Sequence, residues 1–291
     1  LAALGSFSFA ISNIFRRKAV VMVPDATIGA PITVALSVVY FMTILIATDQ
    51  VSTITSFPWQ SYLWLSAAGI IHFVVGRSLN FILMQLVGAN ISNVVNKFSP
   101  VVAVVLGLTV LGETLTWQLV VGVTLIIFGL IITGLNPQMF RSGQKTFSGI
   151  PLKAYLLGLG VGMSFGITPI MIKLGLGSSS SPVAGAFISY TAATIVFSTF
   201  LLNHTKMVSI TTLPSRALIF FCLNGLCTAT AQLLRYTALS LGPVSVIAPI
   251  FNTSPIFTLF LTFLFIRKLE VFSVNVIIGI IIVVVGSILL A

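Results

Sequence analysis

An internal duplication constrains this chain more than any other feature of its sequence. The segment Ser8–Ile14 (SFAISNI) reappears 156 residues later as Ser164–Ile170 (SFGITPI). The same offset, within one residue, relates several small and acidic residues of the two halves. These pairs are Ala2 and Gly158, Ser6 and Gly162, Ala10 and Gly166, Glu113 and Glu270, Gly122 and Gly279, and Gly129 and Gly286. Two copies of so long a unit in an apolar chain are typical of transporters built from internal repeats.

The composition places the duplicated unit in a membrane. Hydrophobic residues make up 57% of the chain and charged residues only 6%, whereas soluble domains carry about 25% charged residues. Apolar runs close to the ~20 residues that cross a bilayer recur along the whole length. We predict ten spans, at residues 1–18, 27–47, 60–86, 91–111, 116–134, 153–173, 183–202, 216–240, 244–266 and 271–290. The predicted fold class is therefore an all-α integral membrane protein with ten transmembrane helices.

The number of spans in each half predicts how the halves are related. Five spans is an odd number, so the second half enters the membrane from the opposite side, and the two five-helix repeats are inverted. The predicted units are a first repeat at residues 1–135, an inter-repeat loop at 136–152 and a second repeat at 153–291. Within these units, tight turns are expected at Gly88 and at Gly242-Pro243, each joining a third span to a fourth.

The formal net charge of +10 does not indicate nucleic acid, because the basic residues form no stripe. Ten of the fourteen fall in expected loops on one side of the membrane: Arg16, Arg17, Lys18, Arg141, Lys145, Lys153, Lys206, Arg216, Arg267 and Lys268. The opposite loops hold only Lys173. This bias predicts that the basic side is cytoplasmic.

Several stretches resemble the drug/metabolite transporter superfamily, and within it the ten-helix EamA-type permeases. They are Gly76–Phe81, Ser99-Pro100, Leu111–Thr116, Ala231–Tyr236 and Ser254–Phe257. The order and repetition of these stretches carry the resemblance, which covers the whole chain. It implies a permease, in a family that carries amino acids, nucleosides, sugars, drugs and other metabolites, and it names no single substrate.

Ionisable side chains inside spans mark candidate transport pathways, because each costs roughly 2.5–3.5 kcal/mol to insert. Arg77 lies about 16 Å along its helix from the expected Gly88 turn, and Lys97 about 13 Å along the next helix, at a 1.5 Å rise per residue. Both are expected near the midplane, with no acid at that depth. The full predicted substrate-binding set is Arg77, Lys97, Asn80, Asn93, Asn13, Asn224, Thr228, Gln232, Arg235 and Asn252, and the predicted hinges are Pro100, Pro169, Pro249 and Pro255.

Structural roles compete with each of these assignments. Instead of binding substrate, Arg235 could extend its guanidinium to the membrane interface. Arg77 could instead form a structural hydrogen bond to backbone carbonyls that are exposed where helices kink. Buried amides such as Asn224 often only bridge helices. We interpret His72 as a packing residue, and Glu113 and Glu270 as caps at helix ends.

The predicted function is transport of a small polar metabolite by alternating access, the substrate being an amino acid or other small organic, anionic or zwitterionic. The alternative is a flippase for a lipid-linked sugar or other amphipathic substrate. An enzyme is not expected, because the predicted spans contain no catalytic nucleophile, metal cluster or acid–base pair. A membrane sensor is not expected either, because a sensor needs a soluble output domain and the sequence predicts none. We expect no cofactor, no metal and no nucleic-acid partner. The expected setting is the lipid bilayer of the plasma membrane, as a multi-pass monomer or weak homodimer.

Overall fold

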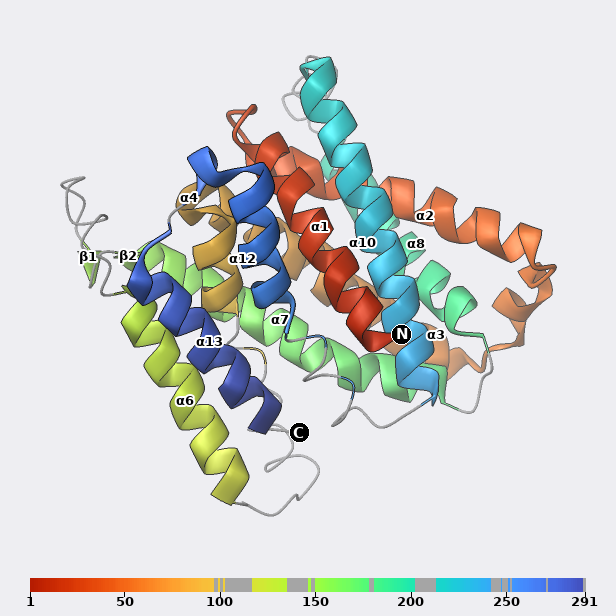
Figure 1. Ribbon diagram of the computed structural model, residues 1–291. Helices are drawn as coiled ribbons and strands as arrows, with labels where there is room; N and C mark the ends of the chain where they lie inside the picture. The colour runs from red at the N-terminus through yellow and green to blue at the C-terminus, as the bar shows by residue number, and fades with distance from the viewer. Residues whose placement is uncertain are drawn as a thin grey trace.

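The computed structural model is helical throughout its long elements (Figure 1). It describes residues 1–96, 99, 102, 117–134, 146–147, 150–177, 181–201, 213–241, 247, 251, 253–270 and 272–289. The helices are α1 (Ala2–Val20), α2 (Gly29–Ala47), α3 (Trp59–Gly69), the π-helix η3 (Ile70–Gly76), α4 (Arg77–Val95), α6 (Trp117–Gly134), α7 (Leu152–Leu176), α8 (Pro182–Leu201), α10 (Ser215–Leu241), α12 (Ser254–Phe265) and α13 (Val274–Leu289). Short 3-10 helices are η1 (Ala26–Ile28), η2 (Val51–Ser56) and η6 (Arg267–Leu269).

Two very short strands, β1 (Thr146–Phe147) and β2 (Ile150–Pro151), pair antiparallel in the expected inter-repeat loop. Five helical segments of the described chain are long and apolar enough to cross a membrane: Ala26–Ala47, Trp59–Val95, Leu152–Leu176, Pro182–Thr199 and Ser215–Leu241. Shorter apolar helices add Val120–Gly129, Ser254–Phe265 and Val274–Gly286. The chain is therefore a multi-pass helical membrane protein.

The predicted turn between the third and fourth spans is confirmed. The backbone of Gly88 has φ 81° and ψ 175°, a conformation that breaks the helix inside α4 and that suits glycine. The third span thus runs from α3 through η3 to this break, and the fourth begins at Ala89. The fourth and ninth spans are described only in part, so the count of ten stays a prediction.

The helices pack in a pattern that is unchanged when the two halves are exchanged. The first helix of the first half, α1, packs along α10, and its counterpart α7 packs along α3 and η3. The second helices of the two halves, α2 and α8, pack on each other, and so do the last helices, α6 and α13. Figure 1 shows α1 beside α10, and α6 beside α13 at the edge of the molecule. This reciprocity is the two-repeat architecture that the duplicated sequence predicts.

Repeated glycines explain the closest of these pairs. A methyl group at Gly129 of α6 would lie 2.9 Å from the carbonyl oxygen of Gly279, and one at Gly286 of α13 would lie 2.8 Å from that of Gly122. A glycine of α6 therefore contacts the backbone of α13, and a glycine of α13 contacts the backbone of α6. Small residues permit such approach where hydrophobic burial does not drive helix association.

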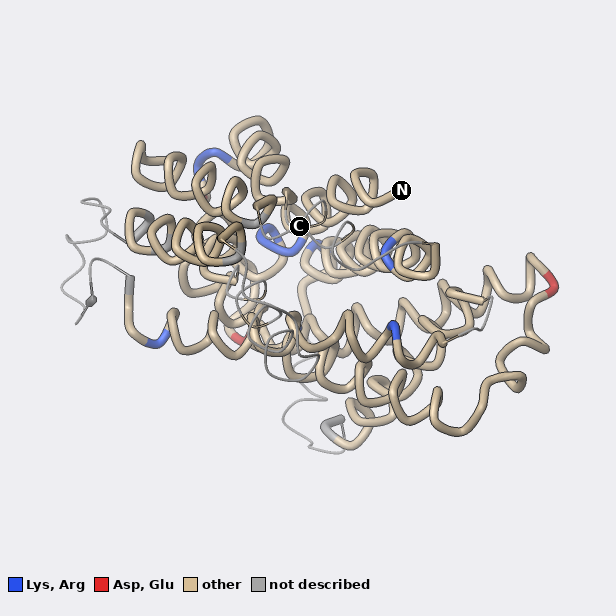
Figure 2. The backbone as a smooth tube through the Cα atoms, turned by 90° about the horizontal axis from the view of Figure 1, so that it is seen from below, with Lys and Arg blue, Asp and Glu red and all other residues tan. Residues whose placement is uncertain are grey.

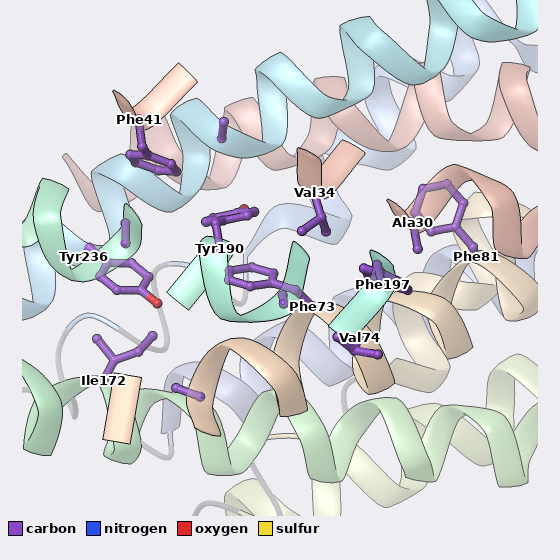
Figure 3. Packing of buried hydrophobic residues seen from close by; sticks show 14 of the residues in the cluster. Ala30, Val34, Phe41, Phe73, Val74, Phe81, Ile172, Tyr190, Phe197 and Tyr236 are labelled. Carbon is purple, nitrogen blue, oxygen red and sulfur yellow. The ribbon is translucent and has the colours of Figure 1, made fainter. Parts of the chain in front are cut away.

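The largest core cluster lies among α2, η3, α8 and α10 (Figure 3). Its centre is aromatic: the rings of Phe73 and Tyr190 stack with centroids 3.8 Å apart, and Phe41 packs on Tyr190 at 5.3 Å. Gly69 lets α3 approach α8, since a methyl group there would lie 2.0 Å from the carbonyl oxygen of Ser189. This core fixes η3, and with it the start of α4, against the second repeat.

Candidate functional site

A cavity of about 180 Å³, lined by both polar and apolar side chains, lies between the two repeats. Elements of both halves line it: α1, η3 and α4 from the first, and α7, α10 and the start of α12 from the second. The lining residues are Phe9, Asn13, Arg16, His72, Arg77, Asn80, Asn93, Asn96, Ser99, Phe165, Gly166, Pro169, Ile170, Thr228, Gln232, Arg235, Leu239, Ile247, Phe251 and Ser254.

One face of α1 brings Phe9, Asn13 and Arg16 to the cavity. Their spacing of four and then three residues puts them on one helical face. The Arg16 guanidinium donates to Oδ1 of Asn80 and lies 5.3 Å from the centroid of the Phe81 ring. Arg16 is only 8% exposed, so this cation belongs to the protein interior. The prediction that it lies in a loop was wrong, because α1 continues to Val20.

The π-helix η3 contains His72 and leads directly into Arg77, the first residue of α4. A π-helix closes hydrogen bonds between residues five apart, which brings positions 72 and 77 toward the same face. Arg77 donates from Nη2 to the Tyr190 hydroxyl at 3.0 Å and from Nη1 to Thr33 Oγ1 at 3.4 Å. Its guanidinium carbon also lies 4.9 Å from the Phe73 ring centroid. Within the described part of the chain, Arg77 is thus held by neutral hydroxyls and rings, and no backbone carbonyl bonds it.

The second repeat contributes Thr228, Gln232 and Arg235 from one face of α10. Gln232 Nε2 lies 3.0 Å from His72 Nε2, a bond that joins the two repeats across the cavity. The His72 ring stacks on Phe165 of α7 with centroids 4.4 Å apart. Arg235 lies with its guanidinium carbon 6.0 Å from the Phe251 ring centroid. These contacts place polar groups from α10 opposite those from η3.

Buried amides close another wall of the cavity. Asn13 donates from Nδ2 to Oδ1 of Asn93 at 3.1 Å and to Oγ1 of Thr258 at 3.2 Å, joining α1, α4 and α12. Seven buried side-chain polar atoms have no hydrogen bond within the described part of the chain, and five of them belong to cavity residues: Arg16 Nε, His72 Nδ1, Asn93 Nδ2, Asn96 Oδ1 and Gln232 Oε1. Unsatisfied buried polar atoms cost free energy, so a ligand that bonds them would gain affinity.

The structure gathers most of the residues predicted to bind substrate. Seven line the cavity: Arg77, Asn80, Asn93, Asn13, Thr228, Gln232 and Arg235. Asn224 does not, because its Nδ2 donates to the Ser12 carbonyl at 2.9 Å and bridges α10 to α1. Lys97 and Asn252 lie outside the described residues.

The predicted hinges have mixed outcomes. Pro169 lies inside α7 and lines the cavity. Pro255 is in the first turn of α12, where proline starts a helix rather than kinking it. Pro100 and Pro249 lie outside the described residues.

Sequence reasoning missed Arg16, His72 and the phenylalanines of the cavity. Arg16 could have been predicted as a cavity residue, because its spacing from Phe9 and Asn13 places all three on one helical face. No spacing rule pointed to His72, because a residue five before Arg77 leaves the face of an ordinary α-helix. The two phenylalanines of the second repeat, Phe165 and Phe251, come from different helices that only the tertiary fold brings together.

The cavity is electropositive. Arg16, Arg77 and Arg235 line it, and no Asp or Glu does so among the described residues. Figure 2 shows the Lys and Arg residues as separate short segments of the described backbone. Arginine keeps its charge in proteins, so the three guanidiniums create a positive potential where the repeats meet.

A two-repeat helical membrane protein with a cavity between its halves, lined in part by charged and amide side chains, has the architecture of a secondary transporter. The sequence profile of the EamA-like transporter family matches residues 1–135 and 152–291. The chain belongs to this family, and the expected resemblance is confirmed.

Comparison with solved structures gives the same fold. One structure, described only as "Crystal structure of protein", aligns over 99% of this chain and 95% of its own, with a TM-score of 0.63 and 15% identity. Such low identity shows the fold alone. No curated protein matches this chain.

Proposed function

We propose that this protein carries a small polar organic metabolite with an anionic group across the plasma membrane by alternating access. The observation that carries this proposal is the cavity where the repeats meet, with Arg16 and Arg77 from the first repeat and Arg235 from the second. Guanidinium groups form strong charge-assisted hydrogen bonds to carboxylates and phosphates. A bound anion would therefore touch both halves of the molecule.

Contact with both halves supports alternating access for a physical reason. A ligand shifts a conformational equilibrium only by its differential affinity for the two states. Cations that belong to different repeats can surround the anion when the repeats close and separate from one another when they open. The hydrogen bond between His72 and Gln232 is one contact across the cavity that such rocking would break and remake.

The test is uptake into liposomes that contain the purified protein. Labelled anionic, zwitterionic and neutral metabolites are offered outside, with and without unlabelled solute inside, and protein-free liposomes set the background. We expect saturable uptake of an anionic solute, faster when the inside is loaded. Uptake at the background rate for every solute would overturn the proposal, and translocation of a fluorescent amphipathic glycolipid instead would favour the flippase alternative.

A further inference from the structure

The three arginines of the cavity have no anionic partner within the described part of the chain. Arg16 bonds the neutral Asn80 amide, Arg77 bonds Tyr190 and Thr33, and Arg235 faces the Phe251 ring. The sequence holds only four acids. Of the three that the structure describes, Asp25 caps η1, Asp49 follows α2 and Glu270 pairs with Arg17, all away from the cavity.

The three charges also act on one another and on a shared residue. Arg77 repels Arg16 electrostatically, and both Arg77 and Arg235 exert their charge on the His72 ring. Like charges held together in a poorly hydrated interior raise the free energy of the empty protein.

We infer that the cavity binds a small organic dianion, a dicarboxylate or a phosphate monoester, between the arginines of the two repeats. This inference rests on the proposed transport function and narrows its substrate class. Two negative charges leave one net positive charge among the three guanidiniums, whereas a monoanion leaves two. A zwitterion brings its own ammonium group into a site that already has three cations.

The rest of the lining selects an organic ligand over a bare ion. Phe9, Phe165 and Phe251 line the same cavity as the arginines, together with aliphatic residues. A volume of about 180 Å³ exceeds the roughly 150 Å³ that accepts a benzene-sized molecule. A carbon chain with an anionic group at each end, or one phosphate, would place its charges on the arginines and its carbons on the rings.

Arg16 is one of the cavity arginines that can engage a second negative charge. Its Nε lacks a hydrogen bond among the described residues although the side chain is buried, so the guanidinium retains a donor for a ligand. Arg77 spends two of its nitrogens on Tyr190 and Thr33. Arg16 from the first repeat and Arg235 from the second therefore both keep donors that a second negative charge could engage.

The experiment measures binding to the purified protein by calorimetry with matched ligands. Succinate is compared with butyrate, which lacks one carboxylate, and glycerol 3-phosphate with glycerol. Inorganic phosphate and glutamine test a bare anion and a zwitterion. We expect one of the two dianions to bind at least about tenfold more tightly than its partner; which one binds distinguishes carboxylate from phosphate recognition. Equal affinities within both pairs, or no binding of either dianion, would overturn the inference.

Variants then test the role of Arg16. Arg16→Gln should reduce dianion binding about tenfold or more and reduce the preference over the matched partner, while Arg16→Lys should restore part of it. Arg216→Gln, at an exposed arginine at the start of α10, is the matched control and should bind like the parent. If Arg16→Gln fails to fold, Arg235→Gln replaces it, since Arg235 makes no side-chain hydrogen bond among the described residues. An unchanged preference in the folded variant contradicts the inference.

Liposome uptake separates this inference from the proposed function. Saturable transport of monoanions or zwitterions without a dianion preference would refute the dianion site and leave transport standing. A dianion that binds tightly but never crosses the membrane would support the dianion site and refute the proposed transport function.

Discussion

Arg17 and Glu270 form an ion pair across the ends of the chain, with Arg17 Nε 2.8 Å from Glu270 Oε1. The same carboxylate accepts hydrogen bonds from the backbone N–H groups of Ala89 at 2.8 Å and Asn90 at 3.0 Å, just after the Gly88 break. Glu270 thus caps a helix, as expected from its place at a turn. The helix that it caps is the start of the fourth span at Ala89, and not the neighbouring helix α13.

Arg17 completes this junction by donating to the carbonyls of Met84 at 3.0 Å and Leu269 at 2.9 Å. Its counterpart in the second repeat, Lys173, donates to the Leu239 carbonyl at 2.9 Å, and Leu239 is the counterpart of Met84. The duplicated sequence therefore makes the same contact twice. In an inverted arrangement the two contacts lie on opposite sides of the membrane.

The first prediction concerns the Arg17–Glu270 pair. The Glu270 side chain is 1% exposed and that of Arg17 is 14% exposed, so the pair is poorly screened. Arg17→Gln, Glu270→Gln and the double variant should give a coupling free energy of about 1–3 kcal/mol in unfolding measurements. Lys268→Gln, an exposed neighbour, should leave the free energy of unfolding nearly unchanged. Additive single effects would show that the pair contributes nothing.

The second prediction concerns Gly88. Gly88→Ala should lower the melting temperature, because φ is 81° and the added methyl group would lie 2.9 Å from Glu270 Oε2. The control is Gly177→Ala, where φ is also positive at 49° but the nearest atom would lie 3.8 Å away. Backbone strain of about 1–3 kcal/mol applies to both sites, so the excess loss at Gly88 measures the collision with the carboxylate. Equal losses would contradict this account.

The third prediction separates a bridging amide from a cavity amide on the same helix. Asn224→Ala should lower stability by about 0.6 kcal/mol, the mean for such bonds in membranes, and leave ligand affinity unchanged. Gln232→Ala should weaken ligand binding, because Gln232 lines the cavity and positions His72. Thermal unfolding and ligand binding of both variants are compared. A larger loss of affinity for Asn224→Ala would reverse the assignment.

The fourth prediction concerns the α6–α13 pair. Gly129→Ala and Gly286→Ala should each destabilise by about 1–3 kcal/mol, because the methyl group meets the backbone of the other helix. Gly160→Ala should be neutral or stabilising, since its methyl group meets only the flexible end of Leu79 and alanine is the better helix former. The apparent melting temperatures of the three variants show whether each substitution destabilises or stabilises the protein. Matching effects at Gly129 and Gly286 would reflect their equivalent places in the repeats.

The fifth prediction tests topology. Lys268→Cys, Arg141→Cys and Lys206→Cys should be labelled only from the cytoplasmic side, and Thr48→Cys, in the loop after α2, only from outside. The background chain replaces the native cysteines Cys222 and Cys227. Labelling of position 268 from outside the cell would show that the basic bias was misread.

The sequence by itself determined the class of fold, the two-repeat plan and the break at Gly88. These follow from properties that are local or periodic: apolar runs of membrane length, repeated glycines at a fixed offset, and a turn between two spans. It also found most of the polar residues that line the cavity, because ionisable and amide groups inside spans are costly and therefore informative.

Only the tertiary structure decided how these residues are used. The π-helix η3, which packs against α7 and α8, brings His72 toward the same face as Arg77, and no pattern in the sequence distinguishes such a segment from an ordinary α-helix. Arg16 became a cavity residue because α1 lies along α10 and α4, and Asn224 became a bridge because Ser12 lies opposite it. Such contacts join residues 64 to 212 positions apart in the sequence. A sequence pattern shows that a polar side chain lies inside a span, but it does not show which distant residue bonds that side chain.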